Sequence, residues 1–468
     1  MLLTSDRSRA IHSLGLRTID AALRRQGFNN TRLPGRHPKV SLENEIKAFM
    51  HDDRQTIFGL QVGNDYWPDF VSQSFALRCD YPGAKIVAGG PAFEREQLRT
   101  AGGQLVPDAI TVALTEHLAD VVVSGYAAPF VEMVARHAGD QAATKLPGLY
   151  YLKDGQVVGH GRGRQPILDP EQDLVPYILI QEDNYAAIML DNACNNACGF
   201  CCVNRGGLGF SQEMVKRTLK HIYQCYDQTK PAQLHFIDSN PFRRVNRFPL
   251  LDLFDQFDET HPNVRKLCYL DPATLTTPGA LDLLARLVKH GFISFFLGRD
   301  TVDEEVAAKI GVNYKGEAKN QNTLNEEGKA IFGLIEGLGA RPLWRGQPFK
   351  VTVAYIMTPF ESKGSLLRMI GEMEKVERAK TTFVETGIRF HALAPYPGTP
   401  IRHWYLDLLK QPDDPHISMS KNAWKHSLGP AAQLLDLFNK ERIYYMFEED
   451  DKGFFDRLRQ DHVEPAFG

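Results

Sequence analysis

Apolar and polar positions alternate with two different periods along the first 140 residues. Four short apolar runs predict buried strands: residues 1–4, 56–62, 84–88 and 120–123. Other stretches repeat apolar positions at helical spacing: residues 13–25, 66–78 and 129–137. Strands that alternate with helices predict a doubly wound, Rossmann-like α/β domain over residues 1–140.

Glycines follow the predicted strands of this domain. In doubly wound folds, ligands bind beyond the carboxyl ends of the strands. Those ends carry the turns Gly63-Asn64-Asp65, Gly89-Gly90-Pro91 and Ser124-Gly125. We therefore expect a ligand site lined by Gly63, Gly89, Gly90 and Gly125.

Residues 141–185 have a different character. Two short strands at 149–152 and 156–159 flank Asp154-Gly155, a dipeptide typical of a hairpin turn. The Pro- and Asp-rich run QPILDPEQDLVPYI follows. This segment is predicted to be a linker between domains that contains a hairpin.

The alternation of strands and helices starts again near residue 186. Six runs predict strands: residues 186–190, 233–237, 266–270, 293–297, 350–357 and 388–393. Helical spacing separates most of them, as at 280–290 and 365–376. Six such units predict a parallel sheet that curves into a partial (β/α)6 barrel over residues 186–400. Residues 401–468 are predicted to form a small, mainly helical C-terminal region.

The overall composition narrows the class of protein. Of 468 residues, 43% are hydrophobic and 24% charged, which is ordinary for a soluble globular protein. The net charge is −3, so no basic excess indicates a nucleic-acid or membrane partner. No apolar run reaches the ~18 residues that span a bilayer, and the N-terminus lacks the apolar stretch of a signal peptide. A cytoplasmic protein is expected.

Cysteines form the sharpest motif. Asp191–Cys202 reads DNACNNACGFCC, directly after a predicted strand. In a reducing compartment, clustered thiols indicate metal or redox chemistry rather than disulfides. Thiolates at Cys194, Cys198 and Cys201 can hold three irons of a cubane cluster, which leaves the fourth iron open to a small-molecule ligand.

A zinc site is the competing interpretation. Structural zinc needs four ligands, and His221 and Cys225, four residues apart on a predicted helix, could complete such a site. The x3/x2 spacing with an aromatic residue, Phe200, before the last cysteine is unusual for zinc.

The CxxxCxxC motif with this aromatic residue resembles that of the radical S-adenosylmethionine (SAM) superfamily. The resemblance implies that Cys194, Cys198 and Cys201 bind a [4Fe-4S] cluster, with Phe200 beside it. SAM would chelate the fourth iron, and one electron would cleave it to methionine and a 5′-deoxyadenosyl radical, which abstracts hydrogen from an unreactive carbon. An electron donor such as flavodoxin, ferredoxin or a dedicated reductase is implied.

The architecture of about residues 1–400, with the GGP turn and APYPGTP at 394–400, is similar to that of the cobalamin-binding subgroup. Two departures from the sequence pattern of cobalamin proteins leave it open whether this chain binds cobalamin. The DxHxxG motif of classical cobalamin proteins is absent, and residues 124–128 read SGYAA where relatives commonly have an acidic turn.

The resemblance also implies roles for residues at the strand ends. Asp238 would meet the amino group of SAM, unless it only caps a helix. Arg299 would hold the methionine carboxylate, unless it forms a salt bridge with Asp300 or Asp303. One of Thr352 and Tyr355 would face the barrel interior, with core packing as the alternative for both.

Three further positions complete the expected site. Gly398 would present backbone near the adenine of SAM. Tyr269 and Asp271 end the third strand, at the mouth where a small-molecule substrate would sit, and together with Tyr355 they are the candidate catalytic residues.

C-methylation of an unactivated carbon through methylcobalamin is the leading outcome. Without cobalamin, the alternative is radical dehydration of a sugar or aminocyclitol diol, which needs a general acid or base. A non-catalytic iron–sulfur or zinc regulatory protein is an alternative from another class.

Overall fold

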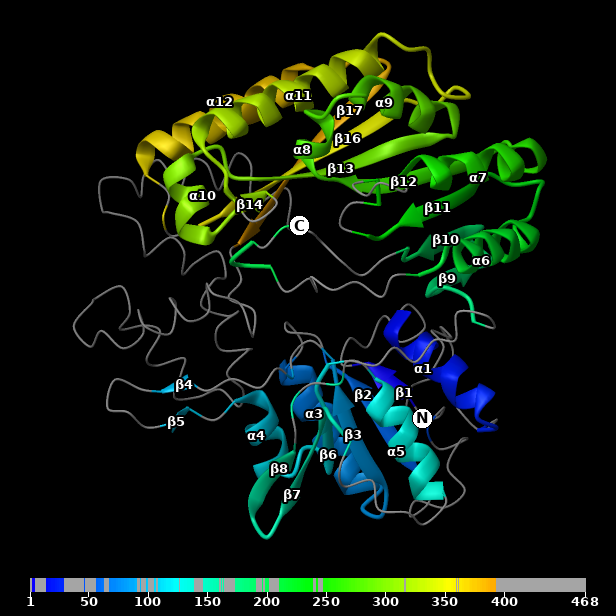
Figure 1. The fold of residues 1–468 in the computed structure, drawn as a ribbon, viewed down its shortest axis with the longest axis vertical. Coiled ribbons are helices and arrows are strands. Elements are labelled where there is room, and N and C mark those ends of the chain that lie inside the picture. The colour runs from blue at the N-terminus through cyan, green and yellow to red at the C-terminus, as the bar shows by residue number, and fades with distance from the viewer. Residues whose placement is uncertain are drawn as a thin grey trace. The chain divides into compact units, whose positions relative to one another are not determined.

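The structure is a computed structural model that divides the chain into two compact units between residues 169 and 170. It describes residues 2–4, 14–28, 46, 56–62, 67–90, 93, 98–99, 105–106, 108–125, 127–138, 146–159, 161, 163, 173–190, 196, 198–201, 210–238, 241–242, 247–314, 317–358, 360 and 362–392. In Figure 1 the first unit runs from blue to cyan and the second from green to orange.

The first unit is built on a six-stranded sheet in the order β1-β2-β3-β6-β7-β8. Its first four strands are parallel, and the last two continue the sheet in antiparallel fashion. The strands are β1 (Leu2–Thr4), β2 (Ile57–Gln61), β3 (Lys85–Gly89), β6 (Val121–Val123), β7 (Leu149–Lys153) and β8 (Gln156–Gly159). A separate two-stranded ribbon pairs β4 (Leu98–Arg99) with β5 (Leu105–Val106).

Helices pack on both faces of this sheet. Phe70 of α3 joins Ile86 of β3 in one apolar core, whereas Leu23 of α1 joins Val87 of β3 in another. Because successive side chains of a strand point to opposite faces, the two cores lie on opposite sides, as the doubly wound prediction requires. The helices are α1 (Leu14–Arg25), α3 (Trp67–Asp80), α4 (Ala109–Thr115) and α5 (Ala128–Ala138).

The hairpin that was predicted as part of a linker belongs to the first sheet. Its strand β7 pairs antiparallel with β6, so that Val122 lies opposite Tyr150. Tyr150 is buried in the same core as Phe70. The apolar residues of the hairpin therefore belong to the core of the first unit. The sequence of the turn alone does not show which core they join.

The second unit contains the predicted partial barrel, a seven-stranded sheet in the order β17-β16-β13-β12-β11-β10-β9. All six predicted strands are present, parallel and in chain order: β10 (Tyr185–Ile188), β11 (Ala232–Phe236), β12 (Val264–Leu270), β13 (Phe292–Asp300), β16 (Phe349–Met357) and β17 (Val384–Ala392). Strand β9 (Tyr177–Ile180), which was not predicted, pairs antiparallel with β10. A short ribbon joins β14 (Asn313–Tyr314) and β15 (Glu317–Ala318).

Helices cover one side of this second sheet (Figure 1). The helices of the second unit are α6 (Gln212–Cys225), α7 (Arg247–Thr260), α8 (Pro272–Leu275), α9 (Ala280–Lys289), α10 (Glu304–Ile310), α11 (Gln321–Gly339) and α12 (Lys363–Arg378). Along the strands, buried residues such as Phe295 and Leu297 alternate with partly exposed ones such as Phe296. We call the side of the partly exposed residues the inner face and the other side the helix-covered face.

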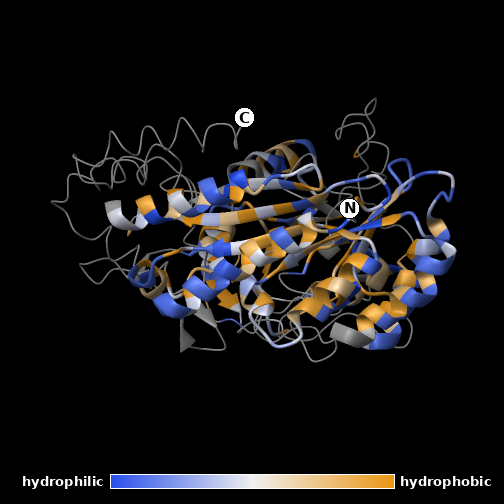
Figure 2. Cartoon of the chain, turned by 90° about the horizontal axis from the view of Figure 1, so that it is seen from above, coloured by the Kyte–Doolittle hydropathy of each residue, from blue (hydrophilic) through white to orange (hydrophobic). Residues whose placement is uncertain are grey.

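Figure 2 shows hydrophilic and hydrophobic residues mixed along the helices, as expected of elements that pack on one side and meet solvent on the other. Within the described ranges, no helix combines the length and the apolarity needed to cross a membrane. The predicted helical region at 401–468 lies outside the described residues.

Candidate active site

A short turn after β10 carries two of the three cysteines of the motif. The Cys201 N–H donates to the carbonyl of Cys198 at 3.2 Å, which folds Gly199 and Phe200 into a tight turn between the two thiols. Both cysteines and Phe200 are partly exposed. Cys194 lies outside the described residues. The two described thiols thus lie on one turn beyond the carboxyl end of the first barrel strand, where the sequence predicted the cluster loop.

The end of β11 holds the start of this loop. Asp238 is buried, and its Oδ2 accepts a hydrogen bond from the backbone N–H of Leu190 at 2.8 Å. Leu190 directly precedes the DNACNNACGFCC segment. Asp238 therefore supports the backbone that enters the motif, and its predicted contact with SAM remains a proposal.

The end of β12 holds the middle of the loop. Asn196 lies between Cys194 and Cys198, and its Nδ2 donates to Oδ2 of Asp271 at 2.9 Å. The other oxygen of Asp271 accepts the Ala273 N–H at 3.0 Å and caps α8. Asp271, predicted as catalytic, thus anchors the motif in this structure.

A backbone contact with α10 provides the third support. The Gly199 N–H donates to the Gly311 carbonyl at 2.8 Å. A Cβ added at Gly199 would lie 2.9 Å from the Ile310 carbonyl oxygen, and one at Gly311 would lie 2.9 Å from the Gly199 nitrogen. Gly311 also has φ +67°, a left-handed value that favours glycine. The close approach of the cysteine turn to the end of α10 therefore requires glycine at both positions.

The two extra ligands predicted for a zinc site do not join the described cysteines of the motif. Cys198, Cys201, His221 and Cys225 are all described, yet among the described residues no three His, Cys, Asp or Glu side chains gather as metal ligands do. Instead, His221 lies 3.9 Å from Cys225 on α6, and its ring packs edge-on against Tyr177. Among the described residues, the zinc alternative therefore loses its two extra ligands.

Aromatic side chains line the inner face on four neighbouring strands. The Tyr185 hydroxyl and His235 Nδ1 are 3.1 Å apart, the His235 ring stacks on Tyr269 with centroids 5.7 Å apart, and Tyr269 contacts Phe296 at 5.0 Å. Burial lowers the pKa of His235, which favours its neutral imidazole. Burial also raises the pKa of Tyr269. Tyr269, a predicted catalytic residue, lies on the face where substrate would bind.

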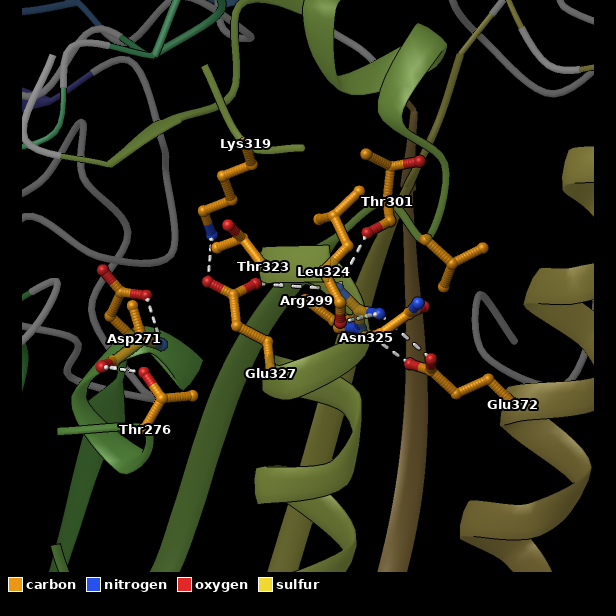
Figure 3. A network of polar contacts seen from close by, with 12 residues as sticks. Asp271, Thr276, Arg299, Thr301, Lys319, Thr323, Leu324, Asn325, Glu327 and Glu372 are labelled. Carbon is orange, nitrogen blue, oxygen red and sulfur yellow. Dashed lines mark hydrogen bonds and ion pairs between the residues drawn. The ribbon is translucent and has the colours of Figure 1, made fainter. Parts of the chain in front are cut away.

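Arg299 does not reach the inner face. Its guanidinium lies under the helices, where it donates to Glu372 at 2.8 and 3.1 Å and to the carbonyls of Thr301 and Leu324. Glu327 is 3.6 Å away (Figure 3). Because protein groups occupy these donors, the predicted pair with the SAM carboxylate does not fit. The predicted alternative, a surface salt bridge, does not fit either, since Arg299 is 2% exposed.

Thr352 and Tyr355, the two candidate residues on the fifth barrel strand, lie on opposite faces of the sheet. Tyr355 is fully buried on the helix-covered face, and its hydroxyl donates to Glu372 at 3.1 Å. Burial raises its pKa well above the usual value for tyrosine. Thr352 is partly exposed and pairs in register with Phe296 of β13 and Gly387 of β17. Thr352 is thus the one that faces the barrel interior, and a catalytic role for Tyr355 does not fit its position.

Asp300 was missed as a site residue. It ends β13 with φ +55° after a register shift between Gly298 and Asp300, and it is partly exposed. Within the described residues, no hydrogen bond or ion pair reaches its carboxylate, because Lys319 pairs with Glu327 at 2.8 Å and Arg299 with Glu372. Burial, together with the nearby carboxylates of Asp271 and Glu327, raises its pKa to about 7.

Lys319 and Glu327 are buried, and they lie 19 and 27 residues after Asp300 in the sequence. No local pattern predicts that they meet the end of β13. The signal for Asp300 was available, however. Phe295 and Leu297 point to the helices, so alternation places Arg299 with them and Asp300 on the opposite face.

The glycines at the strand ends of the first unit are required by the backbone conformation. The Gly89 carbonyl accepts the Val62 N–H at 2.7 Å, and a Cβ at Gly90 (φ +116°) would lie 2.6 Å from the Val62 carbonyl oxygen. Gly125 has φ +88° and bridges to Gly163. Gly63 and Gly398 lie outside the described residues. The close backbone contacts at these strand ends are typical of a Rossmann-like sheet. Cofactor binding at these glycines stays a proposal.

Known structures share this fold. A radical SAM methyltransferase, TsrM, from Kitasatospora setae, solved with cobalamin and a [4Fe-4S] cluster bound, aligns with TM-score 0.60 and 14% identity over 96% of this chain and 89% of that one. The same enzyme with tryptophan substrate and a SAM analogue aligns with TM-score 0.61, also with 14% identity, and with the same coverage of both chains.

The other comparisons carry less. Coproporphyrinogen III oxidase (HemN) from Escherichia coli, a radical SAM enzyme, reaches a TM-score of only 0.29 with 15% identity over 55% of this chain and 59% of that one, which supports no argument. No family model and no curated protein sequence matches the chain. The shared fold with TsrM confirms the predicted fold class, a Rossmann-like domain followed by a partial (β/α)6 barrel.

Proposed function

We propose that the chain is a radical SAM enzyme that methylates a carbon of a small-molecule substrate with the help of cobalamin. One observation carries this proposal. The turn with Cys198 and Cys201 lies beyond β10 in a fold that matches a radical SAM methyltransferase, solved with cobalamin and a [4Fe-4S] cluster bound, over 96% of the chain. Cys194, Cys198 and Cys201 would hold a [4Fe-4S] cluster, and a cytoplasmic electron donor such as flavodoxin or ferredoxin would reduce it.

The inner face of the barrel supplies groups that suit a bound small molecule. Tyr269, His235 and Thr352 lie there, partly exposed, and Asp300 ends the fourth strand on the same side. These polar groups stand among aromatic rings, a combination typical of small-molecule sites. Asp238 is proposed to face the amino group of SAM. The cobalamin would be held at the carboxyl ends of β3 and β6, near Gly89, Gly90 and Gly125.

Incubation of the reconstituted protein with SAM, hydroxocobalamin and a strong reductant tests the proposal. Methyl transfer to cobalamin converts SAM to S-adenosylhomocysteine, whereas reductive cleavage gives 5′-deoxyadenosine and methionine. The proposal predicts S-adenosylhomocysteine that depends on cobalamin. A cluster-containing protein that forms neither product would contradict it and favour a regulatory role.

A second candidate is radical dehydration of a diol without cobalamin. Asp300 favours it, because a carboxyl group with a pKa of about 7 can protonate a leaving hydroxyl at neutral pH. This reaction predicts 5′-deoxyadenosine without S-adenosylhomocysteine, whether or not cobalamin is added. The same product analysis therefore separates the two candidates.

A further inference from the structure

His235 and Tyr269 are diagonal neighbours on the inner face of the barrel. His235 of β11 pairs in register with Leu267 of β12, two residues before Tyr269. Their rings are nearly parallel, with centroids 5.7 Å apart and an angle of 22° between the planes. Because side chains stand roughly perpendicular to a sheet, the outer ends of both rings point away from β11 and β12. Both residues are partly exposed, so these ends meet the side where substrate would bind.

Tyr185 decides which nitrogen of His235 carries the proton. Its hydroxyl oxygen lies 3.1 Å from Nδ1 of His235, and its ring meets the imidazole edge-on with centroids 6.5 Å apart. Burial, followed by the nearby Tyr269, raises the pKa of Tyr185, so the phenol keeps its proton at neutral pH. An imidazole nitrogen has a localised lone pair, whereas the lone pairs of a phenol oxygen are partly delocalised into the ring. The hydroxyl therefore donates to Nδ1, and the proton of the neutral imidazole lies on Nε2.

This Nε2–H is directed to a bound molecule. It lies on the edge of the imidazole farther from the backbone, and the hydroxyl of Tyr269 lies at the outer end of the neighbouring ring. Within the described part of the chain, neither Nε2 of His235 nor this hydroxyl has a hydrogen-bond partner. The edges of aromatic rings carry partial positive charge. The two ring ends together therefore attract an electron-rich acceptor atom and disfavour a cation.

We propose that His235 determines substrate specificity on the inner face, where its Nε2–H binds a neutral acceptor of the substrate such as a carbonyl oxygen or a ring nitrogen. Tyr185 is the positioning residue that keeps the proton on Nε2. This inference rests on the proposed function, because it takes the inner face as the substrate site. Asp238, which holds the start of the cysteine loop, follows His235 by three residues. The acceptor is therefore bound close to the strand ends where the cluster is proposed.

Three probes of similar shape test the chemistry of this site. At neutral pH quinoline has one uncharged acceptor nitrogen, naphthalene has the same rings without an acceptor, and N-methylquinolinium has a positive charge and no acceptor. Binding to the full-length reconstituted protein, without SAM, is measured by saturation-transfer NMR titrations that observe the probe. The inference predicts that quinoline binds about fivefold more tightly than naphthalene, the usual contribution of one hydrogen bond. N-methylquinolinium should bind most weakly.

Matched variants separate the hydrogen bond from the ring. His235→Phe keeps a ring beside Tyr269 and removes the donor, so quinoline should lose its advantage over naphthalene. His235→Gln places an amide donor near the position of Nε2 and should keep part of the advantage. Tyr185→Phe keeps the edge contact and removes only the hydroxyl, so the imidazole can adopt either tautomer and the ratio of the two affinities should fall.

The control is His221→Phe. His221 is a partly exposed histidine of α6 that packs against Tyr177, outside the inner face. Its replacement should leave the ratio of the two affinities unchanged. A merely structural role of Tyr185 or His235 would change the binding of quinoline and naphthalene alike, whereas the proposed hydrogen bond changes their ratio.

Three results would overturn the inference: equal affinities for quinoline and naphthalene in the unaltered protein, a ratio that His235→Phe retains, or tighter binding of N-methylquinolinium than of quinoline. If the protein forms S-adenosylhomocysteine but shows one of these results, only the inference is overturned. If it shows the predicted ratio but forms neither S-adenosylhomocysteine nor 5′-deoxyadenosine from SAM, the proposed function fails and the hydrogen-bonding site stands.

Discussion

The guanidinium of Arg299 and the carboxylate of Glu372 are joined by two hydrogen bonds, of 2.8 and 3.1 Å, on the helix-covered face of the barrel. This fork ties the end of β13 to α12, and the Tyr355 hydroxyl donates to the same carboxylate. Arg299, which the resemblance implied would bind the carboxylate of SAM, thus stabilises the fold instead. If SAM binds as proposed, its carboxylate is held by groups other than Arg299.

Arg299→Ala should strongly destabilise the protein. The change leaves the buried carboxylate of Glu327 and the partly buried one of Glu372 without this cation, which typically costs about 3–5 kcal/mol. Urea unfolding measures the loss. The control is Arg378→Ala, which removes an exposed i, i+4 pair with Glu374 and should cost less than about 1 kcal/mol. Equal effects of the two changes would contradict the assigned role.

Asp300→Asn should remove a pH dependence of stability. The pKa of Asp300 is raised from 3.8 to about 7 in the folded state, so folding favours its protonated form. The stability that Asp300 contributes is therefore fully present below about pH 3.8 and is lost as the pH rises to about 7. At about 1.4 kcal/mol per pKa unit the loss is at most about 4 kcal/mol, and partial exposure reduces it.

Urea unfolding at several pH values between 4.5 and 8 tests this expectation. Relative to the unaltered protein, Asp300→Asn should gain stability as the pH rises to about 7 and stay level above it. Asp183→Asn, at an exposed turn position, should follow the unaltered protein throughout. A constant difference between Asp300→Asn and the unaltered protein across this range would show that Asp300 titrates normally.

Gly199→Ala should lower the iron content of the reconstituted protein. The new Cβ would lie 2.9 Å from the Ile310 carbonyl oxygen, so the turn between Cys198 and Cys201 must move. Iron and sulfide analysis after desalting measures the effect. The control is Gly333→Ala in α11, where nothing lies within 4 Å and where alanine should stabilise the helix by about 1 kcal/mol without loss of iron. An unchanged iron content in Gly199→Ala would contradict the contact.

Cys225→Ser should leave the metal content and the absorption spectrum unchanged. Cys225 lies beside His221 on α6, and the structure does not gather it with Cys198 and Cys201. Metal analysis of the purified variant is the measurement. A loss of zinc or iron in Cys225→Ser would revive the zinc interpretation.

Much of the fold could be predicted because the strands are apolar runs of the expected length. The six barrel strands were recognisable in the sequence because one face of each packs against helices. Val, Ile, Leu and Phe recur on that face. Strand β9 was missed because the Pro-rich segment before it resembles a linker. The hairpin of β7 and β8 was recognised, but which sheet it joins depends on a pairing with β6 that lies far away in the sequence.

The candidate site was predictable only in part. Cys198 and Cys201 were evident from their spacing, and Tyr269 from its place near a strand end. Arg299 was misjudged although alternation along β13 places it with Phe295 and Leu297. Its partner Glu372 lies 73 residues further along the chain, so no local signal marks the pair itself. The register shift between Gly298 and Asp300 is likewise invisible in the sequence.

The most direct test of the account is anaerobic reconstitution with iron and sulfide, followed by desalting and an absorption spectrum, for the unaltered protein and for Cys198→Ala. The account predicts a broad band near ~400 nm, characteristic of a thiolate-bound cluster, that is lost in Cys198→Ala and retained in Cys225→Ser. A protein that binds no iron, or a band of equal strength in Cys198→Ala, would contradict the assignment of the cysteine loop as a cluster site.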